Sequence, residues 1–154
     1  MKHCKLEYKQ FIKQPIDRVF HFFSMPENLE YITPPRLLFR ILTPLPIIIK
    51  KGSIIDYKIK ILGIPVKWKT LITEYIPPHK FIDEQIKGPY SLWKHTHTFI
   101  EEEEGTTIHD KIHYIVPFGM FGRIINLLWI TKDLDSIFTY RRNKIDQYFN
   151  TGNY

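Results

Sequence analysis

The sequence predicts an α+β fold in which a curved, seven-stranded antiparallel sheet wraps around one long C-terminal helix. From residue 54 to residue 116, strand-length segments follow one another with connections too short for crossover helices, so the sheet must be antiparallel. After residue 119, apolar residues recur every three or four positions, as they do on one face of a helix. The 154 residues, 44% of them hydrophobic, allow one well-buried core and not two. We therefore expect a single domain over residues 1–154.

The N-terminal third of the chain is predicted to hold a strand, two short helices and a second strand. Apolar and polar residues alternate over 5–12, which favours the first strand. Pro15 suits the first turn of a helix, and a second short helix is expected over 26–31. The Thr33-Pro34-Pro35 sequence cannot continue that helix, and alternation over 37–42 then favours the second strand.

Five further strands and the final helix complete the expected fold. The strands cover 54–62, 66–76, 80–87, 91–101 and 107–116, and glycine or proline turns separate most of them. The helix is expected to have roughly 25 to 30 residues and to span about 40 Å, enough to cross the whole concave side of the sheet. Its apolar stripe is expected to include Ile124, Leu127, Leu134, Phe138 and Ile145.

The charge and the single cysteine narrow the classes of function. The net charge is +6, from 22 basic and 16 acidic residues, which could favour an anionic ligand, a membrane surface or nucleic acid. The chain has neither a recognition helix nor an RNA-binding signature, so we expect no nucleic-acid partner. Cys4 cannot form an intramolecular disulfide, and no signal peptide or transmembrane helix is predicted. A cytoplasmic location is expected.

Strings of residues along nearly the whole chain carry a family resemblance. They are Pro26-Glu27-Asn28-Leu29 with Thr33-Pro34-Pro35, Trp68, Phe81–Gln85 with Gly88-Pro89, Trp93–Phe99, Asp110 with Tyr114, Pro117-Phe118-Gly119, and Phe138–Arg142. In these strings the chain resembles the START/Bet v 1-like (SRPBCC) superfamily, and within it a bacterial ligand-binding subfamily related to polyketide cyclases and coenzyme Q-binding proteins. The resemblance implies a helix-grip fold with a deep cavity for lipids, isoprenoids, quinones or polyketides.

Strand alternation predicts which side chains face that cavity. Residues two apart on a strand share a face, so Trp93, His95, His97 and Phe99 are expected to point toward the helix together. The same rule leaves His109 and His113 on the outer face, in solvent. The residues we expect to bind a ligand are Trp68, Asp83, Gln85, Trp93, His95, His97, Phe99, Asp110, Tyr114, Phe138 and Arg141.

The polar members of this set allow several chemistries. A buried carboxylate needs a partner, and imidazole is the available donor, so we expect a His-Asp pair among His95, His97, Asp83 and Asp110. That pair is either a hydrogen-bonded network in the cavity wall or the general base of a cyclase, dehydratase or isomerase. Arg141 either meets an anionic ligand, forms a salt bridge to Asp83, Asp110 or Glu84, or packs its stem on the sheet with its charge in water. The His95-x-His97 spacing could also hold a metal ion, but we expect no metal and no cofactor.

Binding or transport of a hydrophobic small molecule is therefore the function that the sequence favours, with the enzyme as the alternative. One further segment, 124–130, is apolar on more than one face and contains Trp129. Transient contact with a membrane, burial against the sheet and a homodimer interface are the three interpretations left open for it.

Overall fold

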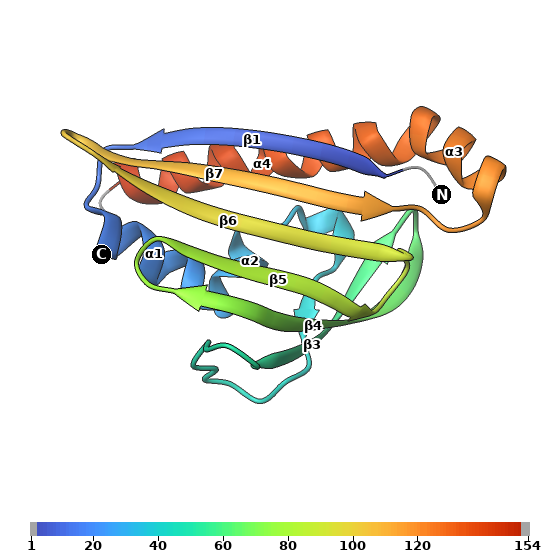
Figure 1. Ribbon diagram of the computed structural model, residues 1–154, viewed down its shortest axis with the longest axis horizontal. Coiled ribbons are helices and arrows are strands. Elements are labelled where there is room, and N and C mark those ends of the chain that lie inside the picture. The colour runs from blue at the N-terminus through green and yellow to red at the C-terminus, as the bar shows by residue number, and fades with distance from the viewer. Residues whose placement is uncertain (1–2, 152–154) are drawn as a thin grey trace.

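Figure 1 shows the computed structural model, in which residues 3–151 are described. The first half contains β1 (Cys4–Ile12), α1 (Ile16–Ser24), α2 (Glu27–Tyr31), the 3-10 turn η1 (Pro35–Leu37), β2 (Arg40–Ile41) and β3 (Ile54–Ile61). The second half contains β4 (Ile64–Ile76), β5 (Lys80–Lys87), β6 (Leu92–Glu102), β7 (Gly105–Ile115), α3 (Gly119–Ile125), the π-helical segment η2 (Asn126–Ile130) and α4 (Thr131–Asn150).

The seven strands form one antiparallel sheet, as predicted, and their order is β1-β7-β6-β5-β4-β3-β2. The meander from β3 to β7 is continuous, and β1 closes the sheet beside β7 (Figure 1). Two register shifts in the pairing of β4 with β5 add local twist to the sheet. The long helical run α3–η2–α4 follows β1 and β7 along the length of the sheet.

Two apolar clusters fix the helices to the sheet. At one end, α1 buries Phe20 against Phe81 and Phe99, and the last turns of α4 add Ile145 and Phe149. In the middle, Leu134 and Phe138 of α4 pack on Ile112 and Tyr114 of β7. Residues from both clusters line the cavity that is described below.

The second strand is much shorter than the predicted 37–42. The prolines at 34 and 35 start a 3-10 turn, and Leu38 then has a positive φ of 43°. This left-handed conformation cannot belong to a strand, so regular pairing with β3 covers only Arg40 and Ile41. Leu42 and Thr43 extend the contact irregularly by donating to the carbonyl of Asp56.

The predicted C-terminal helix is confirmed as an unbroken helical run from Gly119 to Asn150, but it contains a π turn that the sequence pattern did not indicate. At that turn, the Asn126 side chain accepts a hydrogen bond from the Tyr114 hydroxyl, and the main-chain carbonyl of Asn126 accepts one from the Thr131 hydroxyl. A π turn holds one extra residue, which rotates the face that follows relative to the face before it. Ile124 and Leu127 are accordingly exposed, whereas the stripe from Leu134 onward is buried. Within residues 3–151, no helix is both long and apolar enough to cross a bilayer.

Candidate functional site

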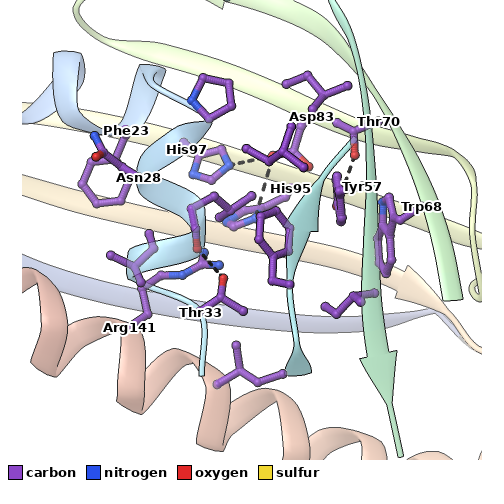
Figure 2. Close-up of a pocket in the computed structure, with 18 of the residues that line it drawn as sticks. Phe23, Asn28, Thr33, Tyr57, Trp68, Thr70, Asp83, His95, His97 and Arg141 are labelled. Atoms are coloured by element: carbon purple, nitrogen blue, oxygen red, sulfur yellow. Dashed lines mark hydrogen bonds and ion pairs between the residues drawn. The ribbon is translucent and has the colours of Figure 1, made fainter. Parts of the chain in front are cut away.

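A cavity of about 170 Å³ lies between the sheet, α4 and the chain segment from α1 to β2. Most of its wall is apolar, with residues from α1, α2, β3, β4, β5, β6 and α4. Seven of the side chains predicted to bind a ligand line it: Trp68, Asp83, Trp93, His95, His97, Phe138 and Arg141. Figure 2 shows Asp83, the two histidines and Arg141 around one space, with Tyr57 and Trp68 beside them.

Strand register brings the two histidines and the two aspartates together. Asp83 of β5 pairs with His95 of β6, and Asp110 of β7 pairs with His97 of β6. The side chains cross this register, because His97 Nε2 lies 2.7 Å from Asp83 Oδ2 and His95 Nε2 lies 2.8 Å from Asp110 Oδ1. The expected His-Asp pair is thus present twice, and we call these four residues the His-Asp quartet.

The quartet is compact and buried. The His95 and His97 ring centroids are 3.7 Å apart, and both side chains are less than a tenth exposed. His97 Nδ1 lies 3.0 Å from Asp110 Oδ1, although the geometry does not make a hydrogen bond. His95 Nδ1 lies 3.9 Å from Asp83 Oδ2. His97 therefore has a carboxylate close to each of its ring nitrogens.

The two histidines have opposite protonation tendencies. Burial disfavours charge on His97, but the hydrogen bond to Asp83 and the attraction to the carboxylates of Asp110 and Asp83 outweigh it and raise the pKa of His97. For His95, burial and the neighbouring charge of His97 together lower the pKa despite the bond to Asp110. Burial also acts to raise the pKa of each aspartate, yet the imidazoles hold the pKa values of Asp83 and Asp110 below the ordinary range. The surroundings of the quartet therefore favour the ionised form of both aspartates, the charged form of His97 and the neutral form of His95.

Arg141 supplies a second positive charge to the site. Its guanidinium carbon lies 4.7 Å from the ring centroid of Phe138, one helical turn earlier on α4. Its Nε is buried without a hydrogen-bond partner, and in the described part of the chain no carboxylate lies within ion-pair distance of it. Burial lowers the pKa of Arg141, while the more distant charges of Asp110 and Asp83 oppose that shift. Of the alternatives predicted for Arg141, the salt bridge is thus not formed within the described residues, and its Nε remains without a partner beside the cavity.

A second buried donor without a partner belongs to Trp68. Its indole Nε1 is buried and unpaired, and its ring stacks on Tyr57 with centroids 5.8 Å apart. Tyr57 and Thr70 line the same wall and lie 3.3 Å apart at their hydroxyl oxygens. Burial raises the pKa of the Tyr57 phenol, which keeps it protonated.

Several polar residues of the lining were not predicted from the sequence. They are Asn28, Thr33, Tyr90, Asp133, Tyr57 and Thr70. The last two could have been found, because Tyr57 alternates with Ile55 and Ile59 on one face of its strand and Thr70 is two residues from Trp68. Asn28 and Thr33 lie in and after α2, where strand alternation gives no information.

Four residues predicted to bind a ligand lie outside the lining. Gln85 instead holds the turn between β5 and β6, because its amide donates to the carbonyl of Tyr90 at 2.7 Å and accepts from the Tyr90 amide at 3.3 Å. Phe99 is buried in the α1 cluster, and the Tyr114 hydroxyl donates to Asn126. Asp110 stands behind the two histidines, where it supports them without reaching the cavity.

The outer face of β7 also differs in one detail from the expectation. His109 points away from the cavity as predicted, but its side chain is only 13% exposed. It lies 3.1 Å from Glu7 on the neighbouring strand β1, so it is paired on the surface of the sheet and not fully solvated.

Three residues of the quartet are also close enough together to be considered as a metal site. Asp83, His95 and His97 offer ligand atoms that all lie within 4.8 Å of one another. Binding a metal would require neutral imidazoles, whereas the two flanking carboxylates raise the pKa of His97 and favour its charged form. The positive charge of Arg141 at the same site opposes a cation as well. The residues present therefore fit a hydrogen-bonded network better than they fit a metal ion.

No family model matches the sequence, and no curated protein matches it either. Solved structures do resemble it. Protein Ms6760 from Mycobacterium smegmatis has a TM-score of 0.69 and 16% identity, over 96% of this chain and 91% of that one. Major latex-like protein 151 from Panax ginseng has a TM-score of 0.69 and 16% identity, over 96% of this chain and 97% of that one. TTHA0849 from Thermus thermophilus has a TM-score of 0.66 and 16% identity, over 92% of this chain and 97% of that one. These likenesses show that the chain has the same fold as these three proteins, and this is the helix-grip arrangement predicted from the sequence.

Proposed function

We propose that this protein binds or transports a hydrophobic small molecule whose polar end is a hydrogen-bond acceptor, such as a carboxylate, phenolate or quinone-type carbonyl. The observation that carries the proposal is the pair of buried, unpartnered donors, Trp68 Nε1 and Arg141 Nε, in residues that line an otherwise apolar cavity. Leaving a buried donor unpaired costs roughly 1 to 3 kcal/mol, so a ligand that supplies the acceptor would recover that free energy on binding. The fold is consistent with this role, since helix-grip proteins resemble one another in having a cavity beside the last helix.

The charge balance of the site favours an acceptor over a cationic ligand. The carboxylates of Asp83 and Asp110 are already balanced by the His97 imidazolium and the Arg141 guanidinium. A cation would meet Arg141 without a free carboxylate to receive it, because Asp83 and Asp110 are bonded to imidazoles and the third carboxylate, Asp133 of the lining, is paired with Arg36. An acceptor group meets two donors that have no other partner.

Cavity volume limits the size of the buried group. A cavity of 170 Å³ is close to the roughly 150 Å³ that holds one benzene ring in an engineered apolar core. A ring with one or two oxygen substituents therefore fits as it stands, which favours the polyketide-like and quinone-like classes. The chain of a lipid or isoprenoid would have to extend from the cavity, past rim residues such as the exposed Met25.

A matched pair of arginines tests the proposal. We expect the single-ring carboxylate trans-cinnamate to bind, and Arg141→Met to weaken it by about tenfold or more, as for the loss of a charged hydrogen bond. Arg142→Met is the control, because the neighbouring Arg142 is exposed and donates to the carbonyl of Lys9 outside the cavity. Calorimetric titration of cinnamate and of its methyl ester measures both effects. Equal affinities of the two arginine variants would contradict the assignment of Arg141 to the ligand.

The natural ligand can be sought directly. Protein purified under native conditions is denatured in organic solvent, and the released molecules are identified by mass spectrometry against a mock preparation. We expect an aromatic or quinone-like compound with at least one acceptor oxygen. A released compound that is fully saturated and lacks oxygen would contradict the proposal.

An enzymatic role in the same cavity is the second candidate, and the different protonation of the two histidines favours it. His95 is the neutral imidazole and lines the cavity, so it is the residue that could remove a proton from a bound carbon acid. Both ring nitrogens of His97 face carboxylates, so Arg141, whose Nε has no partner, is the group suited to stabilise an enolate oxygen. Exchange of the α-protons of 2-tetralone with deuterated water, followed by NMR, tests this role. His95→Gln should abolish the exchange while leaving cinnamate binding in place, and a rate no faster than that of buffer would reject the enzyme.

A further inference from the structure

Among the described residues, a large exposed apolar surface lies outside the cavity lining, on α3 and the π-helical segment. Phe118, Met120, Phe121 and Leu127 are each between 73% and 77% exposed. Ile124, Leu128 and Trp129 are about half exposed. The three aromatic side chains, at roughly 200 Å² each, leave on the order of 400 Å² of apolar area in water, which already reaches the largest patches of ordinary monomers. We call these seven residues the α3 patch.

The backbone holds this patch away from the sheet. Phe118 and Gly119 both have positive φ values, of 72° and 52°, and they turn the chain sharply at the end of β7. Gly122 faces back toward Pro117 so closely that a Cβ there would overlap the Pro117 carbonyl oxygen. Figure 1 shows α3 at one end of the molecule, beyond the end of β7. The patch is therefore built into the fold and is not a frayed part of the core.

The charges around the patch have one sign. From residue 111 to residue 132 the chain contains no Asp or Glu, whereas Arg123 and Lys132 lie within and directly after the patch. The next acidic residues along the chain are already engaged: Asp133 forms an ion pair with Arg36 at 2.8 Å, and Asp135 accepts a hydrogen bond from Tyr8. An apolar helix face with aromatic residues and flanking cations is the composition of helices that lie in a membrane interface.

We propose that the α3 patch docks the protein on the surface of an anionic lipid bilayer. Phe118, Phe121 and Leu127 enter the boundary between headgroups and acyl chains, Trp129 lies at headgroup level, and Arg123 and Lys132 contact the anionic headgroups. A second copy of the chain is a poorer fit. In a two-fold dimer the same patch would face itself and bring the cations of both copies together without acidic partners from the patch. The proposal goes beyond ligand binding and does not depend on it.

Vesicle binding by the wild type, two double variants and one control variant tests the proposal. We expect the protein to sediment with vesicles of phosphatidylcholine and phosphatidylglycerol, and much less with phosphatidylcholine alone. Phe121→Ser with Leu127→Ser should reduce the partition coefficient at least tenfold, since two exposed anchors lose their apolar surface. Arg123→Gln with Lys132→Gln should reduce it about fivefold for each charge removed, and only on the anionic vesicles. Ile86→Ser is the matched control, because Ile86 is 51% exposed on β5 and outside the patch.

Tryptophan fluorescence places the contact on the molecule. Trp129 is 55% exposed, whereas Trp68 is only 6% exposed, so a blue shift on adding anionic vesicles should come from Trp129 and vanish in Trp129→Phe. The proposal is overturned if the wild type does not sediment with anionic vesicles at low salt, or if the Phe121/Leu127 variant sediments as well as the wild type. A second outcome also overturns the proposal. If light scattering shows that the wild type is a dimer and the Phe121/Leu127 variant is a monomer, and neither protein binds vesicles, the patch is covered by a second copy of the chain and not by a membrane.

Discussion

Replacing His97 by glutamine should destabilise the protein, and the cost should depend on pH in a defined direction. His97 lies between Asp83 and Asp110, with a nitrogen 2.7 Å from one carboxylate and 3.0 Å from the other. Glutamine can still donate to one of them but carries no charge, so two buried carboxylates lose a shared cation. Removing one partner of a buried ion pair costs roughly 3 to 5 kcal/mol, and we expect about 3 kcal/mol here because one hydrogen bond survives.

The sign of the pH dependence follows from the pKa of His97, which the two carboxylates raise on folding. A raised pKa contributes stability that is fully present below the unfolded value of about 6.5 and is lost as the pH rises through the folded value. The cost of His97→Gln should therefore be largest near pH 6 and should shrink at alkaline pH, where the wild type also loses the imidazolium. Urea denaturation of both proteins across this range measures the difference in the free energy of unfolding.

The matched control is His109→Gln, on the outer face of the neighbouring strand. His109 is paired with the exposed Glu7, and surface pairs contribute about 0 to 1 kcal/mol. A cost of His97→Gln that stays the same from pH 6 to alkaline pH would refute the charged state assigned to His97. A cost no larger than that of His109→Gln would refute the energetic importance of the quartet altogether.

Three other substitutions should have separable effects. Trp68→Phe should change the melting temperature little, because its indole N–H has no partner in the free protein, yet it should weaken cinnamate binding in calorimetric titration. Gly88→Ala should cost about 1 kcal/mol in urea denaturation, since its Cβ would overlap Gln85 Oε1 and displace that side chain from the turn, and the cost should disappear in a Gln85→Ala background. Gly122→Ala should cost more than Gly88→Ala, because its Cβ would meet the backbone oxygen of Pro117, which cannot swing aside as a side chain can.

The sheet could be predicted from the sequence because strand alternation is a local signal. The strand Lys80–Lys87 has its predicted bounds, and the other four strands of the meander differ from theirs by at most two residues at either end. The edge strand β2 was predicted, but its bounds could not be, since they are decided by the left-handed Leu38 before it and by the irregular contact of Leu42 and Thr43 with Asp56 after it. Alternation also placed the histidines on the inner face. It could not say which histidine bonds to which aspartate, because that depends on the register of three strands.

Neither the volume of the cavity nor the full set of residues that line it could be predicted from the sequence. Its volume depends on how far Phe138 and Arg141 stand from the sheet, which is a property of tertiary packing and leaves no pattern along the chain. The sequence also could not decide whether Arg141 pairs with an aspartate or with a ligand, because it cannot show whether Asp83 and Asp110 are already bonded to imidazoles. Once both are, the guanidinium has no carboxylate left to pair with, and its donors remain for a ligand.

The π turn explains why one helix serves two different environments. A regular helix from Gly119 to Asn150 would carry the stripe of Ile124 and Leu127 onto the same face as Leu134 and Phe138. The extra residue in the π turn breaks that continuity, so the first part of the run presents its apolar side chains to the outside and the second part presents them to the sheet. The hydrogen bond from Tyr114 of β7 to Asn126 ties the sheet to this junction at 2.9 Å. The α3 patch and the cavity residue Arg141 therefore lie on one continuous helical run, with the π turn between α3 and α4.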